Sequence, residues 1–234
     1  MNELNYGWDQ VRTRIHEACH RVGRDPQDLH VVAVTKYLDL EETKQVLDTG
    51  FVHVGESRVQ DAVPKWKNLG NRGIWHFIGH LQRNKVKDVI GRFQYLHSLD
   101  RFSLAEEVNK RALQKEINVR CFLQVNVSGE ESKYGISPNQ LDEFAKEVAN
   151  LSQIEVVGLM TMAPKLERTE EVRPVFRELK RLQQRLQKLD NPRLQVPHLS
   201  MGMSQDFDIA IEEGATWIRL GSILVGGYKR GGNL

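Results

Sequence analysis

The chain has 234 residues, of which 40% are hydrophobic and 27% charged, and its 33 basic and 31 acidic side chains give a formal net charge of +2. This near-neutral balance excludes the basic stripe that binding to a nucleic acid backbone needs, because that affinity scales with the number of phosphates neutralised. No apolar run approaches the ~18 residues of a membrane span, and the first residues carry both charge signs. We therefore expect a cytoplasmic protein that binds neither nucleic acid nor membrane.

Two cysteines, Cys19 and Cys121, each lie in an apolar-patterned segment and not in a C-x-x-C pair. Free cysteine behaves as a small hydrophobe. We expect both to be buried thiols, and we predict no metal site.

An amphipathic helix opens the chain. Apolar residues recur at helical spacing from Trp8 to Val22, and Gly23 ends the segment. This helix precedes the first strand and therefore connects no two strands. We expect it to cover one end of the folded domain.

After this helix, short β-branched apolar runs alternate with longer stretches of helical spacing. The period is roughly twenty to forty residues, as a strand plus a crossover helix requires. Continuous apolar runs are typical of strands buried on both faces, and strict alternation with helices favours parallel pairing. The eight runs are Val31–Thr35, Phe51–Val54, Ile74–Ile78, Tyr95–Leu99, Val119–Val127, Val156–Met160, His198–Met201 and Trp217–Leu220.

The stretches between the runs have apolar residues three and four positions apart. The segment 141–148 follows Ser137 and Pro138, which suit a helix N-cap and a first helical position. The longest apolar stripe, over 170–189, faces a polar side rich in Arg and Lys. That side could be a docking surface, but the interspersed Glu and Gln favour a solvated helix face.

Eight strand-helix units in one chain are most simply arranged as a (β/α)8 TIM barrel, here with an additional N-terminal helix. The alternative is a doubly wound open sheet, which normally has a glycine-rich turn after its first strand. The first run ends instead in Val34-Thr35-Lys36-Tyr37. No linker or low-complexity tract divides the chain, so we expect residues 1–234 to form a single domain.

Candidate site residues lie where the strands end, because active sites of such barrels occupy the carboxyl ends of the strands. Lys36 follows the first strand. It is either a solvated ammonium on the rim or a nucleophilic amine in the mouth, where partial desolvation lowers its pKa and allows a Schiff base with an aldehyde or ketone.

The loops after the seventh and eighth strands have the composition of a phosphate site. Backbone N–H groups, a helix N-terminus and small hydroxyl residues commonly hold phosphate at this place in the fold. Ser200, Ser204, Gly221 and Ser222 supply these parts. Ser and Gly are also common in ordinary turns and caps. Together with Lys36, these residues describe a cradle for a phosphorylated aldehyde.

Several motifs resemble those of one known family. The segment Trp75–Lys85 reads W-H-F-I-G-H-L-Q-R-N-K and closely resembles the signature of the pyridoxal phosphate homeostasis proteins, the YggS/PROSC family. The resemblance covers about residues 5 to 228. Its other motifs are A-V-T-K at 33–36, G-E-S-R-V-Q at 55–60, N-V-S-G-E-E-S-K-Y-G at 126–135, S-M-G-M-S at 200–204 and R-L-G-S at 219–222.

The resemblance implies a fold similar to the barrel domain of alanine racemase and pyridoxal 5′-phosphate (PLP) as cofactor, bound as an internal aldimine. By this resemblance Lys36 is the PLP lysine and Arg219 faces the pyridine nitrogen. Ser200, Ser204, Gly221 and Ser222 fall on the phosphate-binding motif, with Met201 as a site neighbour. Ser57 departs from the family, which usually carries Asn after G-E. The resemblance therefore does not extend to the polar contact that this Asn makes near the cofactor.

Other residues of the motifs have two interpretations each. His76 is more often a hydrogen-bonded structural histidine near a site than a proton-transfer group. His80, Asn84 and Lys85 either contribute to the site or cap the next helix. Lys133 is a second amine near the mouth or a surface residue.

Two arguments favour binding over catalysis. An arginine beside the pyridine nitrogen does not hand over its proton, which leaves the ring a poor electron sink. Racemisation needs a base on each face of the substrate carbanion, and Lys36 supplies only one. Racemases similar to this barrel take their other base, a tyrosine, from an additional C-terminal domain. We expect no room for that domain in a chain ending at Leu234.

The sequence therefore predicts a non-catalytic PLP carrier that acts in intracellular PLP homeostasis. We expect apo PLP-dependent enzymes to be its protein partners. A weak PLP-dependent amino acid racemase acting through Lys36 is the alternative. A Schiff-base aldolase for sugar phosphates uses the same lysine and phosphate cradle, but it is colourless.

Overall fold

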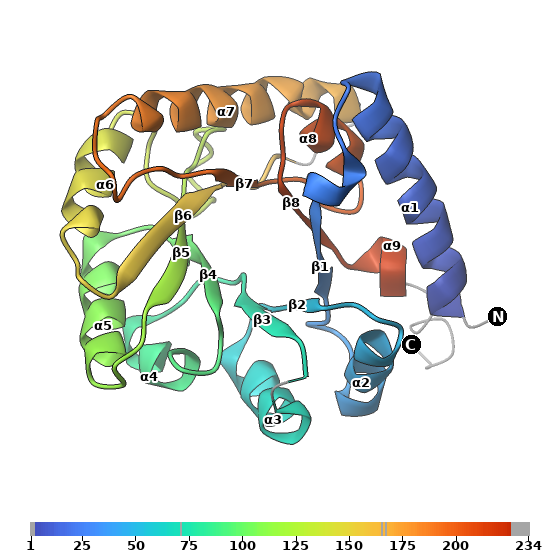
Figure 1. Cartoon of the computed structure of the whole chain (residues 1–234), viewed down its shortest axis with the longest axis horizontal. Coiled ribbons are helices and arrows are strands. Elements are labelled where there is room, and N and C mark those ends of the chain that lie inside the picture. The colour runs from blue at the N-terminus through green and yellow to red at the C-terminus, as the bar shows by residue number, and fades with distance from the viewer. Residues whose placement is uncertain (1–2, 71, 165, 167, 226–234) are drawn as a thin grey trace.

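Eight parallel strands close into a barrel in the computed structural model, which describes residues 3–70, 72–164, 166 and 168–225 (Figure 1). The strands are β1 His30–Val34, β2 His53–Glu56, β3 Ile74–Phe77, β4 Tyr95–Leu99, β5 Val119–Gln124, β6 Ile154–Met160, β7 His198–Ser200 and β8 Trp217–Leu220. Each strand pairs with its neighbour in sequence, and β1 pairs with β8, so that His30 lies beside Trp217. The predicted barrel is confirmed.

Helices follow the strands in turn and cover the outside of the barrel. They are α1 Glu3–Arg21, α2 Leu40–Asp48, α3 Val59–Leu69, α4 Val86–Val89, α5 Phe102–Leu113, α6 Leu141–Ala149, α7 Arg173–Gln187, α8 Phe207–Glu212 and α9 Ser222–Val225. The connections contain the short 3-10 helices η1 Pro26–Asp28, η2 Arg83–Lys85 and η3 Thr169–Val172. No helix in the described ranges is long and apolar enough to cross a membrane.

The predicted strand bounds are close to the observed ones, and two of the eight agree at both ends. β2 is His53–Glu56, two residues later at both ends than the predicted Phe51–Val54, and β5 ends at Gln124 and not at Val127. Val125, just beyond this end, forms an isolated bridge to Ile136, because the chain there turns into the long connection to α6. Its apolar character reflects burial under that connection, since Val125 is 1% exposed.

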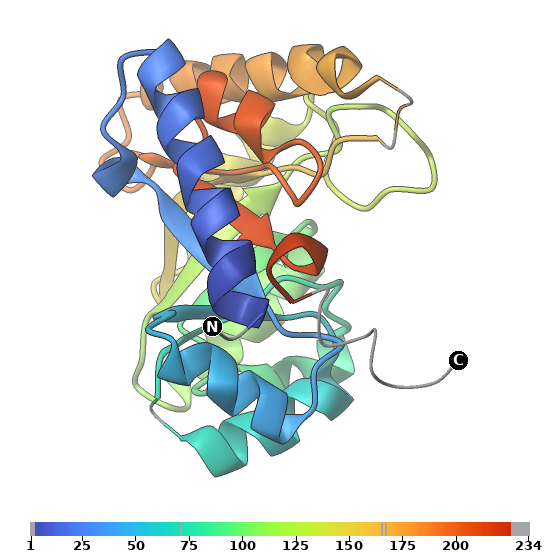
Figure 2. The same cartoon turned by 90° about the vertical axis from the view of Figure 1, so that its right-hand side faces the viewer.

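The expectation for α1 was wrong. The helix packs along the flank of the barrel, against α8 and α9, and does not cover an end (Figures 1 and 2). The 19-residue α1 lies in the outer ring of helices, alongside α8 and the described residues of α9. Arg24, just after α1, donates hydrogen bonds to the carbonyls of Ile211 and Ala215 and fixes this packing.

The barrel interior contains buried polar side chains as well as apolar ones. Side chains at alternate strand positions point the same way, so Tyr95 and His97 share the interior, as do Trp217 and Arg219. An apolar cluster of Val32, Phe122, Val157, Met160 and Trp217 fills part of this space. The buried polar side chains beside it include His76, His97, Ser200 and Arg219. These residues position the site.

Candidate functional site

Lys36 lies at the carboxyl end of β1, in the turn that leads to α2. Its side chain is partly exposed, and Nζ lies 4.7 Å from the centroid of the Tyr37 ring. Asp39 caps the N-terminus of α2 and forms a capping box with Glu42, which fixes the far side of the turn. Lys36 borders a cleft of about 530 Å³ between this turn and α3, lined also by Gln60 and other residues of both segments.

A buried ion pair between Glu56 and Lys65 stabilises the turn between β1 and α2. Glu56, at the end of β2, accepts hydrogen bonds from Lys65 Nζ at 2.8 Å and from Thr35 Oγ1 at 2.6 Å. Lys65 also donates to the Thr35 carbonyl at 2.7 Å. Burial raises the pKa of Glu56, and the charge of Lys65 opposes that rise. This triad anchors the residue that immediately precedes Lys36.

Arg219 lies in the barrel interior, on β8, and is 5% exposed. It donates from Nη1 to Ser200 Oγ at 2.6 Å and from Nη2 to the Thr161 carbonyl at 3.0 Å. Burial lowers the pKa of Arg219 to about 10, and the nearby Asp206 opposes this shift. The guanidinium therefore keeps its charge at neutral pH, in an orientation fixed by two adjacent strands.

The predicted phosphate residues separate into two groups. Ser204 Oγ accepts hydrogen bonds from the backbone N–H groups of Gly221 at 3.2 Å and Ile223 at 3.4 Å, at the turn from β8 into α9. Ser222 is exposed in the same turn. Ser200, by contrast, is fully buried on β7, and its hydroxyl contacts Arg219 and His97.

A tight loop carries Ser204 to this turn. Gly202 has a φ of +91°, and a Cβ there would lie 2.6 Å from the Cβ of Ala210, so only glycine suits this position. Asp206 accepts from the backbone N–H of Met203 at 2.5 Å, and the Gly202 carbonyl accepts from Arg219 N at 3.0 Å. The loop after β7 is thereby attached to β8.

The site neighbours predicted from the motifs are distributed around the same barrel. Met201 is fully buried beside β8, and its N–H donates to the Trp217 carbonyl at 3.1 Å. The backbone at Ser57 lies so close to Gly79 that a Cβ at Gly79 would be 2.0 Å from the Ser57 carbonyl oxygen. Lys133 pairs with Glu130 at 2.9 Å.

His76 is a fully buried, hydrogen-bonded histidine. Its Nδ1 lies 2.9 Å from His97 Nε2, and its Nε2 lies 3.0 Å from His53 Nδ1. Sequence reasoning missed His53, His97 and the Glu56–Lys65 pair. The available signal was polar residues inside otherwise apolar strand segments, such as the histidine in Tyr95–Leu99.

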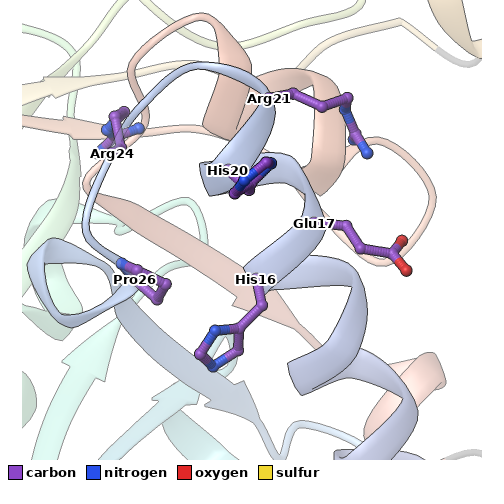
Figure 3. A pocket seen from close by; sticks show the side chains of 6 residues that line it. All are labelled: His16, Glu17, His20, Arg21, Arg24 and Pro26. Carbon is purple, nitrogen blue, oxygen red and sulfur yellow. The ribbon is translucent and has the colours of Figure 1, made fainter.

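Two other clefts lie away from the carboxyl ends of the strands. One, of about 540 Å³, is formed by the last turns of α1 and the segment up to Pro26 (Figure 3). The other, of about 650 Å³, lies over the amino ends of the strands from β4 to β7 and includes Tyr95, Arg120 and His198. Neither cleft is lined by Lys36, Ser204 or Gly221.

Metal and thiol chemistry have little support in the described part of the chain. No group of three or more His, Cys, Asp or Glu side chains there is arranged to hold a metal ion. Cys19 and Cys121 are buried free cysteines, as predicted, and burial raises the pKa of each thiol.

Comparison with known proteins defines the class of this barrel. Residues 9–229 match the family described as the alanine racemase N-terminal domain. Alanine racemase of Clostridium difficile 630 superposes with a TM-score of 0.72 at 14% identity, over 96% of this chain and 56% of that chain. That likeness shows a shared fold alone.

Nearer relatives define the family. The pyridoxal phosphate homeostasis protein of Aquifex aeolicus is 43% identical over 94% of this chain and 96% of its own, and that of Escherichia coli K12 is 34% identical over 97% of each. PipY of Synechococcus elongatus PCC7942, solved with PLP bound, has a TM-score of 0.78 and 31% identity, over 90% of this chain and 99% of that chain. The chain belongs to the pyridoxal phosphate homeostasis protein family, as its motifs predicted.

Proposed function

We propose that the protein binds PLP at the carboxyl ends of β1, β7 and β8 and serves in PLP homeostasis. The observation that carries this proposal is the buried Arg219 on β8, held by Ser200 and the Thr161 carbonyl. β8 lies between β1, which Lys36 follows, and β7, which leads into the loop that carries Ser204. Relatives named for PLP homeostasis, and PipY with PLP bound, support it.

The residues at the β8–α9 turn have the donors that a phosphate needs. The Gly221 and Ile223 N–H groups converge on one oxygen, Ser204 Oγ. Converging backbone amides and a hydroxyl are a common anion-binding arrangement. A Cβ at Gly221 would already lie 3.4 Å from Val34 Cβ, so the turn is packed closely against β1. We assign phosphate binding to Ser204, Gly221 and Ser222.

Ser200 has a different task in this proposal. Its hydroxyl lies 2.6 Å from Arg219 Nη1 and 2.8 Å from His97 Nδ1 inside the barrel. We therefore assign Ser200 to orienting the arginine that faces the cofactor ring. Its contribution to cofactor binding is indirect, through Arg219.

PLP, when bound, supplies an aldehyde that an amine can attack and a pyridine ring that accepts electrons well only when its nitrogen is protonated. Lys36 is the amine that we propose to bond covalently with the aldehyde. Arg219 would donate a hydrogen bond to the ring nitrogen and would keep its proton, because its pKa of about 10 is far above that of a pyridine. This arrangement favours storage and delivery over carbanion chemistry.

Mass spectrometry after borohydride reduction tests the proposal. Reduction fixes a covalent adduct between PLP and an amine, and peptide mapping identifies the lysine. We expect one PLP adduct, on Lys36. An adduct on Lys133 or Lys85 would reject the assignment of Lys36, and a colourless protein without adduct would favour the aldolase.

The remaining parts of the proposal concern the physiological role. We propose that the whole chain, residues 1–234, is one PLP-binding barrel domain, that it acts in the cytoplasm, and that apo PLP-dependent enzymes receive its cofactor. We also propose that it is not an enzyme, because Lys36 is the one base that we assign to the site. Sustained turnover of D- or L-alanine by the purified yellow protein would support the racemase instead.

A further inference from the structure

Three histidines and a serine form a continuous hydrogen-bonded chain through the barrel interior to Arg219. His53 Nδ1 lies 3.0 Å from His76 Nε2, and His76 Nδ1 lies 2.9 Å from His97 Nε2. His97 Nδ1 lies 2.8 Å from Ser200 Oγ, which accepts from Arg219 Nη1 at 2.6 Å. This hydrogen-bonded histidine chain begins at His53, at the amino end of β2, and ends at Arg219, which we place against the cofactor ring.

The three imidazoles are held in the neutral state. Burial lowers the pKa of His53 to about 4 and places the pKa values of His76 and His97 well below the ordinary value. Each ring therefore has one N–H donor and one bare nitrogen acceptor. Aromatic packing fixes two of the ring planes, since Tyr95 stacks on His76 and Phe122 on His97.

A chain of neutral histidines has only two consistent directions. In one, each ring donates from Nδ1 toward Ser200, whose oxygen then accepts from both His97 and Arg219. In the other, Ser200 donates its hydroxyl hydrogen to His97 Nδ1, and each ring donates from Nε2 to the next, ending at His53.

The two directions differ in what they leave unpaired. Arg219 is a donor only, so His97 Nδ1 is the one acceptor that the described residues offer to the buried Ser200 hydroxyl hydrogen. The first direction leaves this hydrogen without a partner, and an unpaired buried donor is costly. The second direction pairs the Ser200 hydroxyl hydrogen and both contacts between the rings. The N–H that it leaves without a partner among the described residues is on His53, which is only half-buried. The guanidinium also polarises the Ser200 hydroxyl and strengthens its donation.

We propose that His97, supported by His76 and His53, is a positioning residue for Arg219: an ordered chain of Nε2–H histidines orients the Ser200 hydroxyl so that its oxygen faces and holds the guanidinium. This inference rests on the proposed function where it concerns PLP. The part of the inference that concerns the histidine tautomers and the Arg219 contact involves only residues of this protein and is tested without cofactor.

Histidine side-chain NMR on the cofactor-free, ¹⁵N-labelled protein measures the direction. Long-range ¹H–¹⁵N correlations report which ring nitrogen carries the proton, and single substitutions assign the signals among the eight histidines. We expect His53, His76 and His97 all to carry the proton on Nε2 at neutral pH. A proton on Nδ1 of His97 would overturn the proposal.

The same samples report whether the histidine chain positions Arg219. A guanidinium held by two acceptors rotates slowly, so its Nη hydrogens give separate, protected signals. We expect these signals in the parent and in H97N, whose side-chain oxygen can replace Nδ1 as acceptor, and their loss in S200A and H97L. Equal signals in H97N and H97L would show that His97 acts by packing and would reject the proposal.

A mutant cycle on PLP affinity gives the second readout. We expect S200A and H97L each to weaken PLP roughly 5- to 20-fold, and the double variant to bind no more weakly than S200A alone, because both remove one path to Arg219. Additive losses would contradict the proposal. S200A alone, with a small change in volume, keeps the test valid if H97L does not fold.

Failure of the two proposals can be told apart. If the parent binds no PLP, the proposed function fails, while the tautomers and the Arg219 signals still decide whether the histidine chain positions the arginine. If the parent binds PLP but His97 carries its proton on Nδ1, only the positioning proposal fails.

Discussion

Arg219 donates to Ser200 Oγ at 2.6 Å between two neighbouring strands of the barrel, β8 and β7. The contact leaves Ser200 buried within the barrel, whereas Ser204 contacts the Gly221 turn. Two serines four positions apart in one motif therefore belong to different parts of the site. Substitutions at the two positions should affect different properties of cofactor binding.

Lys36→Ala should abolish the visible absorption band of the purified protein. The side chain is partly exposed, and its loss removes the amine without opening a core cavity. The far-UV circular dichroism and Tm should stay close to those of the parent. Absorbance spectra and reduced-adduct mass spectrometry check this.

Lys133→Ala is the matched control for Lys36→Ala, since Lys133 is a partly buried lysine in the connection between β5 and α6, paired with Glu130 at 2.9 Å. This variant should keep the band. A band that persists in Lys36→Ala, with an adduct mapped to Lys133 or Lys85, contradicts the assignment.

Gly221→Leu should weaken PLP roughly tenfold or more while changing pyridoxal binding much less. The reason is that this turn donates its N–H groups to the phosphate in our proposal, and pyridoxal lacks that phosphate. Titration of both ligands, followed by fluorescence, measures the difference. Equal weakening of both would mean that Gly221 acts through its packing against Val34, 3.4 Å from its ideal Cβ.

Arg219→Glu should change the chemistry that the site permits. A carboxyl group at this position can protonate the ring nitrogen and improve the electron sink. We expect slow conversion of bound PLP to the pyridoxamine form when an amino acid is added, detected by absorbance and by chromatography of the released cofactor. Arg219→Lys, which keeps a cation, is the control and should show no conversion. A Glu variant that retains PLP but converts it no faster than the parent argues against Arg219 as the ring-nitrogen partner.

Lys65→Met should destabilise the fold by about 3–5 kcal/mol, because it leaves the buried Glu56 without its cation. Glu56 is fully buried and Lys65 is 6% exposed, so solvent screens this pair little. Adding Glu56→Gln should recover part of the loss. Urea unfolding of the two single variants and the double variant checks this, and a double variant less stable than Lys65→Met would contradict the account.

Acidification should destabilise the folded protein between about pH 6.5 and pH 4. Histidine titrates near 6.5 in an unfolded chain, whereas burial lowers the pKa of His53 to about 4 and those of His76 and His97 well below 6.5. In this range the unfolded chain binds protons that the folded chain does not, so stability is complete above about pH 6.5 and is lost as the pH falls. Buried Glu56 and Asp206, with raised pKa values, act in the opposite direction.

Thermal unfolding as a function of pH measures this effect. H53N should reduce the slope of the profile between pH 6.5 and pH 4, while His76 and His97 keep part of it. An H53N profile identical to that of the parent would show that His53 does not contribute to the acid sensitivity.

The sequence by itself determined the barrel and the approximate positions of its eight strands. Apolar runs such as Tyr95–Leu99 are local patterns, and their alternation with helical segments leaves few topologies. The sequence pattern suggested Lys36 as a site residue because it directly follows such a run. The proposal for Arg219 came only from the family resemblance, since the eighth run alone does not show its partners.

Only the tertiary structure decided which polar groups meet inside the barrel and where α1 packs. His97 and Ser200 are 103 positions apart, and Arg14 and Asp208, which join α1 to α8, are 194 apart. Contacts at such separations depend on strand register and on which side of each strand faces inward, and a one-residue shift reverses that side. The place of α1 was decided in the same way, because its packing against α8 and α9 joins the two ends of the described chain and leaves no trace in any local pattern.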